Sequence, residues 1–289
     1  MDFDQFLASA WRDHGDDAPG VALRLQQGPG LLAQSSQVLP LTRIVLHVFA
    51  EHLGQWAACG AALDAIAALP QAQGDAAAEA ALRVARQALA LAQGATGDCA
   101  LAPAQQIAAL CSASAISSGR ADLDGAVRHF EAALALAHGS NADPAGFQRA
   151  LAVCAHNLAC VLGDCAQRTP QQTGQMLHAA RTSRVWWQRA GTWLEVERAE
   201  YALARSHVRA GDAAQALVHA RACLDICQAN AAPDFELFFA HEALAVVAAA
   251  LPDSALRMSA GAAARAAHAR LGAGEQQACA AELKALATA

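Results

Sequence analysis

Apolar residues recur at intervals of three and four positions along nearly the whole chain of 289 residues. This spacing places apolar side chains on one face of an α-helix, and no segment shows the strict alternation that is typical of a strand. The pattern therefore predicts an all-α protein. The predicted helices span residues 2–14, 17–27, 38–53, 55–69, 75–93, 101–118, 122–138, 144–163, 170–190, 193–210, 213–229, 233–250, 253–271 and 273–287.

The breaks between these helices carry residues that favour helix ends. Asp143 is predicted to cap a helix that starts at Pro144, because Asp is a good N-cap and Pro tolerates the first helical position. Gly211 and Asp212 are predicted to form a tight turn. Since these connections are short, we expect consecutive helices to pack antiparallel.

One helical pattern repeats at a fixed spacing. Leu158–Ala159 recurs 45 residues later as Leu203–Ala204, and Ala126 recurs 90 residues later as Ala216. Fixed-period similarity between helix pairs is typical of a solenoid, in which each unit buries its apolar face against its neighbours.

The segment from Glu200 to Leu224 resembles a tetratricopeptide repeat, and partial matches make the resemblance cover about residues 101–229. The positions that carry it are Leu203, Ala204, Gly211, Asp212, Ala216, Leu217 and Leu224 in the first match, Ala126, Phe130, Ala133 and Leu134 in the second, and Asn157, Leu158 and Ala159 in the third.

Three features depart from this family. The spacing of 45 residues exceeds the family's unit of about 34. Glu200 stands where a large aromatic residue is expected, and the closing proline is absent after Leu224. The chain thus resembles a divergent branch with longer helices.

The resemblance implies a right-handed superhelix of antiparallel helix hairpins, an α-solenoid similar to tetratricopeptide-repeat proteins. It also implies a concave groove that binds a peptide, protein segment or partner domain, without catalysis and without a cofactor. Glycine and proline interrupt the period before residue 37. We therefore expect residues 1–36 to form an irregular helical N-terminal cap and residues 37–289 to form a single continuous repeat domain.

The net charge is −6, which argues against nucleic-acid binding because that binding depends on a basic surface. The first residues lack the basic and apolar regions of a secretory signal, so we expect a cytoplasmic protein. The longest uncharged stretch, Cys99 to Gly119, contains Pro103 and several Ser and Gln residues. It is predicted to form a packed helix hairpin rather than a membrane span.

One predicted helix carries Arg198, Arg205 and Arg209 on the side opposite its apolar face, with Tyr201 beside them. In the family that the chain resembles, the first helix of each pair lines the concave groove. Guanidinium groups bind carboxylates in a bidentate way, so we predict that these four residues bind a partner, and that the partner is acidic. The alternative is an ordinary solvated face, neutralised by Glu197 and neighbouring acids.

Cysteine and histidine residues recur at four-residue spacing in His219–Cys223–Cys227 and again in His156–Cys160. Zinc would accept four such ligands if they converged. The first set, however, shares its helix face with alanines that the repeat pattern assigns to the core, so we interpret the nine cysteines as reduced thiols that pack as small apolar residues.

Two other histidine segments are predicted to be structural. His47, Glu51 and His52 lack a second histidine one turn from the first, and His241–Glu242 is followed by Ala245 where the second histidine of a zinc protease motif would stand. We therefore expect no bound metal.

Trp186 and Trp187 are adjacent, so both cannot face one apolar stripe of a helix. A partly exposed tryptophan would anchor a partner. Packing between longer helices is the alternative that we favour.

We find no phosphate-binding loop, nucleophile elbow or kinase signature. The predicted function is therefore a non-enzymatic scaffold or adaptor that binds a protein or peptide. Two alternatives stay open: a ligand- or peptide-responsive regulator that acts through a partner chain, and a metal-binding protein that uses the Cys and His pairs. Homodimer formation through the alanine-rich ends also stays open.

Overall fold

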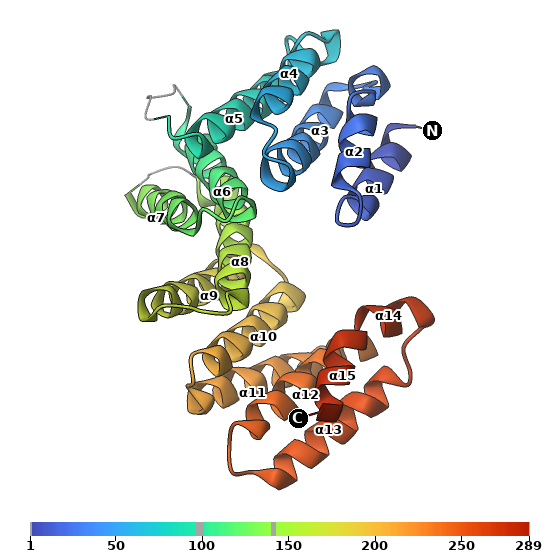
Figure 1. Ribbon diagram of the computed structural model, residues 1–289, viewed down its shortest axis with the longest axis vertical. Coiled ribbons are helices and arrows are strands. Elements are labelled where there is room, and N and C mark those ends of the chain that lie inside the picture. Colours follow the sequence, from blue (N-terminus) through green and yellow to red (C-terminus); the bar gives the residue numbers. More distant parts are fainter. Residues whose placement is uncertain (1, 96–100, 140–142, 289) are drawn as a thin grey trace. The chain divides into compact units, whose positions relative to one another are not determined.

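The computed structural model describes residues 2–95, 101–139 and 143–288, and within these ranges it contains helices and no strand. The prediction of an all-α fold is confirmed for this part of the chain (Figure 1). The α-helices are α1 (Phe3–Asp13), α2 (Ala18–Leu25), α3 (Val38–Val45), α4 (Trp56–Ala67), α5 (Ala76–Ala92), α6 (Pro103–Gly119), α7 (Leu123–Gly139), α8 (Gln148–Asp164), α9 (Pro170–Ala190), α10 (Trp193–Arg209), α11 (Ala213–Ala229), α12 (Asp234–Ala249), α13 (Ser254–His268), α14 (Ala273–Ala278) and α15 (Ala280–Thr288). The other helical turns are η1 (Gly28–Leu31), η2 (Ser35–Gln37), η4 (Pro70–Ala72) and η5 (Pro144–Gly146), which are 3₁₀-helices, and η3 (Leu46–His52), which is a π-helix.

Most predicted helices agree with these bounds to within two or three residues, and the differences have local causes. The helix predicted at 38–53 changes from α to π geometry at Leu46. Asp143 does cap a helix, but the turn that it caps is the short η5, and α8 starts only at Gln148. Residues 103–119 form one continuous helix rather than the predicted hairpin, while Cys99 lies outside the described residues.

Capping side chains explain why several helices start where they do. Thr169 and Thr192 each accept a backbone hydrogen bond at the N-terminus of α9 and α10, and each pairs with a Gln or Glu three residues later in a capping box. Asp212 and Asp253 accept comparable bonds at the starts of α11 and α13. These bonds satisfy backbone N–H groups that have no partner within the helix.

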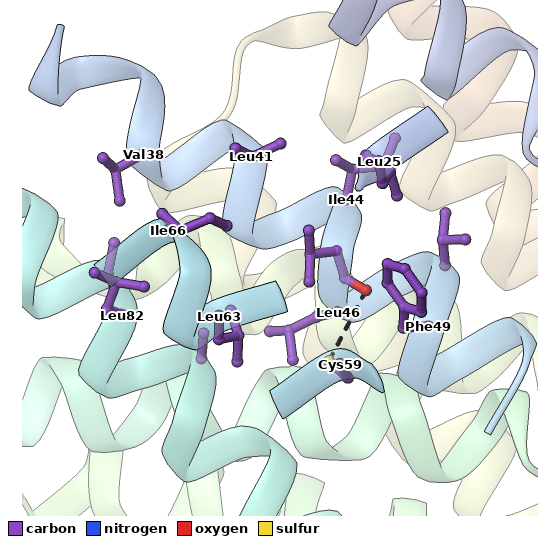
Figure 2. Close-up of a cluster of buried hydrophobic side chains, with 14 of the residues drawn as sticks. Leu25, Val38, Leu41, Ile44, Leu46, Phe49, Cys59, Leu63, Ile66 and Leu82 are labelled. Carbon is purple, nitrogen blue, oxygen red and sulfur yellow. Dashed lines mark hydrogen bonds between the residues drawn. The ribbon is translucent and has the colours of Figure 1, made fainter. Parts of the chain in front are cut away.

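The chain forms two compact units, Met1–Cys154 and Ala155–Ala289. In the N-terminal unit, one apolar core joins the first two helices to the helices that follow, and fully buried Leu41, Ile44, Leu63 and Ile66 lie at its centre (Figure 2). Phe6, Val21 and Leu32 belong to the same core, so the segment before residue 37 packs with the helices that follow it. The prediction of a cap followed by one continuous domain stays a prediction.

In the C-terminal unit, helices that are consecutive in sequence pack on one another from α9 to α13, and α10 also contacts α12. Small residues occupy the centre of this packing: Ala204, Ala216, Ala220 and Ala243 are fully buried. Small side chains allow helices to approach closely. Two of these alanines are positions that carried the resemblance to a tetratricopeptide repeat.

No helix in the described ranges is both long enough and apolar enough to span a bilayer.

The turn between α10 and α11 confirms the break predicted at Gly211 and Asp212. Gly211 has φ = +77°, the left-handed region that costs other residues about 1–2 kcal/mol. An added Cβ would meet no atom within 4 Å, so the cost of Gly211→Ala is conformational. We expect this substitution to destabilise the protein by about 1 kcal/mol in urea unfolding.

Gly174 is a matched control, because it lies inside α9 and an added Cβ also meets nothing within 4 Å. Gly174→Ala should stabilise by roughly 0.5–1 kcal/mol, since helical φ favours alanine. Equal effects of the two substitutions would contradict this account of the turn.

Candidate functional site

Helix α10 brings the four predicted partner-binding residues to one cavity. Arg198, Tyr201, Arg205 and Arg209 all line a cavity of about 460 Å³ in the C-terminal unit, together with side chains of α8, α12 and α15. The opposite side of α10 is buried. The helical periodicity therefore identified which side of α10 faces the cavity.

Each of the three guanidinium groups is already paired with a carboxylate of the chain. Arg198 donates to Glu236 (Nη2–Oε1 2.6 Å) and Arg205 donates to Glu242 (Nη1–Oε1 2.7 Å). The third pair joins Arg209 to an exposed aspartate on α8, with 3.0 Å between Nη2 and Oδ1. These guanidiniums therefore do not form the free basic surface from which an acidic partner was predicted.

The carboxylates of α12 that accept these bonds are buried. The side chain of Glu242 is 1% exposed and that of Glu236 is 6% exposed. Glu242 also accepts a hydrogen bond from the hydroxyl of Tyr201, at 3.1 Å. Burial raises the pKa of Glu242, and the positive charge of Arg205 opposes that shift. Because a buried carboxylate needs such a partner, these arginines stabilise the fold as well as line the cavity.

Glu197 also lines the cavity, but it lies deeper than the sequence suggested. Its side chain is buried and its Oε1 accepts a hydrogen bond from the Cys223 thiol, at 2.9 Å. Its Oε2 is shielded from water and has no donor at ordinary hydrogen-bond geometry among the described residues, although the nearby Cys227 thiol lowers the pKa of Glu197. Burial raises the pKa of Glu197 to about 7. In the alternative of a solvated helix face, Glu197 was one of the neutralising acids, whereas it belongs to the interior.

A second cavity residue has a similar unpaired oxygen. Oε2 of Glu282, on α15, is buried and finds no partner in the described part of the chain. The aromatic rings of Phe235 and Phe239 contribute apolar surface to the same cavity. The cavity thus combines apolar walls with carboxylate oxygens that lack donors. The helical pattern gave no signal for Glu282, because it lies more than 70 residues beyond α10.

Glu200, which replaces the aromatic residue of the repeat pattern, joins three helices. It accepts hydrogen bonds from Arg184 of α9 (2.5 Å) and from His219 of α11 (2.7 Å). Burial opposes its ionisation, but the bonds from His219 and Arg184 lower the pKa of Glu200 below its ordinary value. Glu200 is therefore buried with a hydrogen-bond partner on each of the two neighbouring helices.

Cys223 and Cys227 are fully buried, which confirms their interpretation as core thiols. The hydrogen bond with Cys227 and burial raise the pKa of Cys223 far above its ordinary value, so it stays a neutral thiol. His219, the third member of the set, is bonded to Glu200 instead. His156 and Cys160 do lie together, with 3.7 Å between Nε2 and Sγ, and both line the cavity.

Both adjacent tryptophans are buried, which agrees with packing between helices rather than with an exposed anchor. Trp186 is 4% exposed and Trp187 is 8% exposed. The turn after α9 covers the second ring, since a Cβ on Gly191 would lie 3.1 Å from an atom of the Trp187 ring. The turn that follows α9 therefore lies against Trp187, on a side of the helix that its apolar stripe does not include.

No protein-family model matches this sequence, and no curated protein matches it. Among solved structures, the fold is similar to the crystal structure of BtubC (BKLC) from P. vanneervenii, with a TM-score of 0.55 and 15% sequence identity. The similarity covers 93% of this chain and 92% of that chain. At this level of identity the likeness shows the fold alone.

Proposed function

We propose that this chain is a non-enzymatic helical-repeat protein, similar to tetratricopeptide-repeat proteins, that binds a segment of a partner protein at the α10 cavity. The sequence repeat and the packing of consecutive helices support this proposal. In such a protein, the helices would stack as antiparallel hairpins in a right-handed superhelix, and α10 would face the concave side. The cytoplasm is the expected location.

The observation that carries the proposal is the charge arrangement of the cavity. Three guanidiniums are paired, while the Oε2 atoms of Glu197 and Glu282 have no donor. A buried carboxylate oxygen without a donor is costly, and a charge-assisted hydrogen bond would relieve that cost. We therefore propose that the bound segment presents a Lys or Arg side chain, rather than the acidic group that the sequence suggested.

The apolar walls fit the same occupant. Long basic side chains carry an aliphatic stem that packs on apolar surface and a charged end that seeks a polar partner. Phe235 and Phe239 would contact the stem, and their ring faces attract a cation. Glu282 would then accept a hydrogen bond from the charged end.

Peptide pools that differ at one fixed position, Lys, Glu or Ser, test this proposal by fluorescence anisotropy. We expect the Lys pool to bind most tightly and Glu282→Gln to weaken its binding by about tenfold or more, since a hydrogen bond to a charged group contributes about 1.5–3 kcal/mol. Glu275→Gln is the control, because Glu275 is an exposed glutamate at the start of the neighbouring α14. Preference for the Glu pool, or equal affinity of the Glu282→Gln variant, would reject a basic segment.

A cavity of about 460 Å³ also lies within the range of small-molecule sites, which favours a ligand-responsive regulator as the second candidate. The same assay separates the two functions when a small diamine replaces the peptide. Diamine binding that changes the radius of gyration in solution scattering would support the regulator; peptide binding without such a change supports the scaffold.

A further inference from the structure

Three histidines come together in the N-terminal unit, far along the sequence from α10. His14 follows the last residue of α1, while His47 and His52 lie in the π-helix η3. One ring nitrogen from each lies within 4.8 Å of the other two. The Nε2 atoms of His47 and His52 are 3.1 Å apart.

Hydrogen bonds at Nδ1 fix the ring hydrogen of two of these histidines, and the remaining nitrogen of His47 accepts a hydrogen bond from Nε2 of His52, which a bound ion would replace. Nδ1 of His14 lies 2.5 Å from the carbonyl oxygen of Trp11, and Nδ1 of His47 lies 2.7 Å from Oε2 of Glu51. Both acceptors place the ring hydrogen on Nδ1, so Nε2 of each ring carries a lone pair. A carboxylate that orients a histidine in this way is a frequent outer partner in metal sites.

The π geometry explains why His47 and His52 meet. Residues five apart lie about one turn apart in a π-helix, because its hydrogen bonds run from i to i+5, whereas in an α-helix they point in different directions. α-Helical spacing does not bring His47 and His52 together, so this pair was not predictable from the helical pattern. Its third member, His14, comes from a separate helix.

Helix α6 supports the π-helix at the position of this cluster. Arg120, which follows α6, donates a hydrogen bond to the carbonyl oxygen of His52 (3.0 Å). The preceding Gly119 lies so close that an added Cβ would be 2.7 Å from the carbonyl oxygen of Glu51. The backbone that carries two of the histidines and their carboxylate is thus packed in place.

We propose that His14, His47 and His52 bind a divalent transition-metal ion, with Zn²⁺ as the expected ion and Glu51 as the outer carboxylate. Imidazole nitrogens are good ligands for Zn²⁺, Ni²⁺, Cu²⁺ and Co²⁺. Tetrahedral zinc with bonds of about 2.0–2.1 Å needs ligand nitrogens roughly 3.4 Å apart, so small ring rotations bring the three histidines into place. The fourth position would be open to water or to another ligand, and the ion would join α1 to η3.

The test is calorimetric titration of the full-length, metal-free and reduced protein with Zn²⁺. We expect one ion per chain. Replacing His14, His47 or His52 by alanine should weaken binding by more than the roughly 10–100-fold that is typical of removing an outer partner, and Glu51→Gln should fall within that range. His138→Ala, an exposed histidine of the same unit, is the matched control and should bind as the original chain does.

A second measurement separates the histidines from the nine cysteines as ligands. Co²⁺ bound by imidazole alone shows no thiolate charge-transfer band. Trp11 lies 5.1 Å from His47 between ring centroids, so Co²⁺ should also quench fluorescence that is lost in Trp11→Phe. A thiolate band, or unchanged Zn²⁺ affinity in variants whose circular dichroism matches that of the original chain, would overturn the proposal.

Discussion

Replacing Arg205 by alanine is expected to destabilise the C-terminal unit by about 3 kcal/mol, because it leaves Glu242 buried without its cation. The side chain of Glu242 is 1% exposed, so water replaces the lost partner poorly. The Tyr201 hydroxyl would remain as its donor. Urea unfolding followed by circular dichroism measures the loss.

A double variant shows whether buried charge is the cause. Adding Glu242→Gln to Arg205→Ala removes the charge, so the double variant should recover much of the lost stability. Arg209→Ala is the matched control, since its aspartate partner is 73% exposed and such pairs contribute less than about 1 kcal/mol. Similar losses for Arg205 and Arg209 would show that packing, rather than charge, accounts for the effect.

Glu197→Gln should remove a part of the free energy of unfolding that depends on pH and amounts to about 3 kcal/mol. This is the free energy that corresponds to raising the pKa of Glu197 from 4.5 to about 7. The folded state raises the pKa of Glu197, so it binds a proton more tightly than the unfolded chain does. The stabilisation that comes from this tighter proton binding is fully present below pH 4.5 and is lost as the pH rises to 7. The variant should therefore match the original chain at acidic pH and exceed its stability above neutrality.

Urea unfolding across this pH range tests the prediction, with the difference between the two proteins isolating Glu197. Asp225→Asn is a suitable control, because Asp225 is an exposed carboxylate on α11. Its difference from the original chain should stay flat across the same range. A flat difference for Glu197→Gln as well would mean that Glu197 has the same pKa in the folded and the unfolded state.

The helices and the side of α10 that faces the cavity were predictable because both follow from local spacing. The ion-pair partners were not: Glu236 and Glu242 follow Arg198 and Arg205 by 38 and 37 residues, so their approach depends on how α10 packs with α12. The prediction of an acidic partner rested on the positive charge of three arginines and did not include the carboxylates that pair with them.

The histidine cluster was missed for a different reason. The change from α to π geometry at Leu46 has no marker in the apolar pattern, and it alters which residues share a face. Packing against Gly119 and Arg120 accompanies the change, and both residues lie more than 60 positions away. The contact between Trp187 and the turn after α9 was likewise not predictable from the apolar pattern of the helix.

Side-chain bonds connect α10 to four other helices: α8 through Asp164, α9 through Arg184, α11 through His219, and α12 through Glu236 and Glu242. In repeat proteins that touch only adjacent units, the ends fray independently of the middle. Here the side-chain bonds extend to the second helix along the chain on both sides, so displacing one helix exposes charged groups of another. Helices α9 to α12 should consequently lose their structure together instead of one after another.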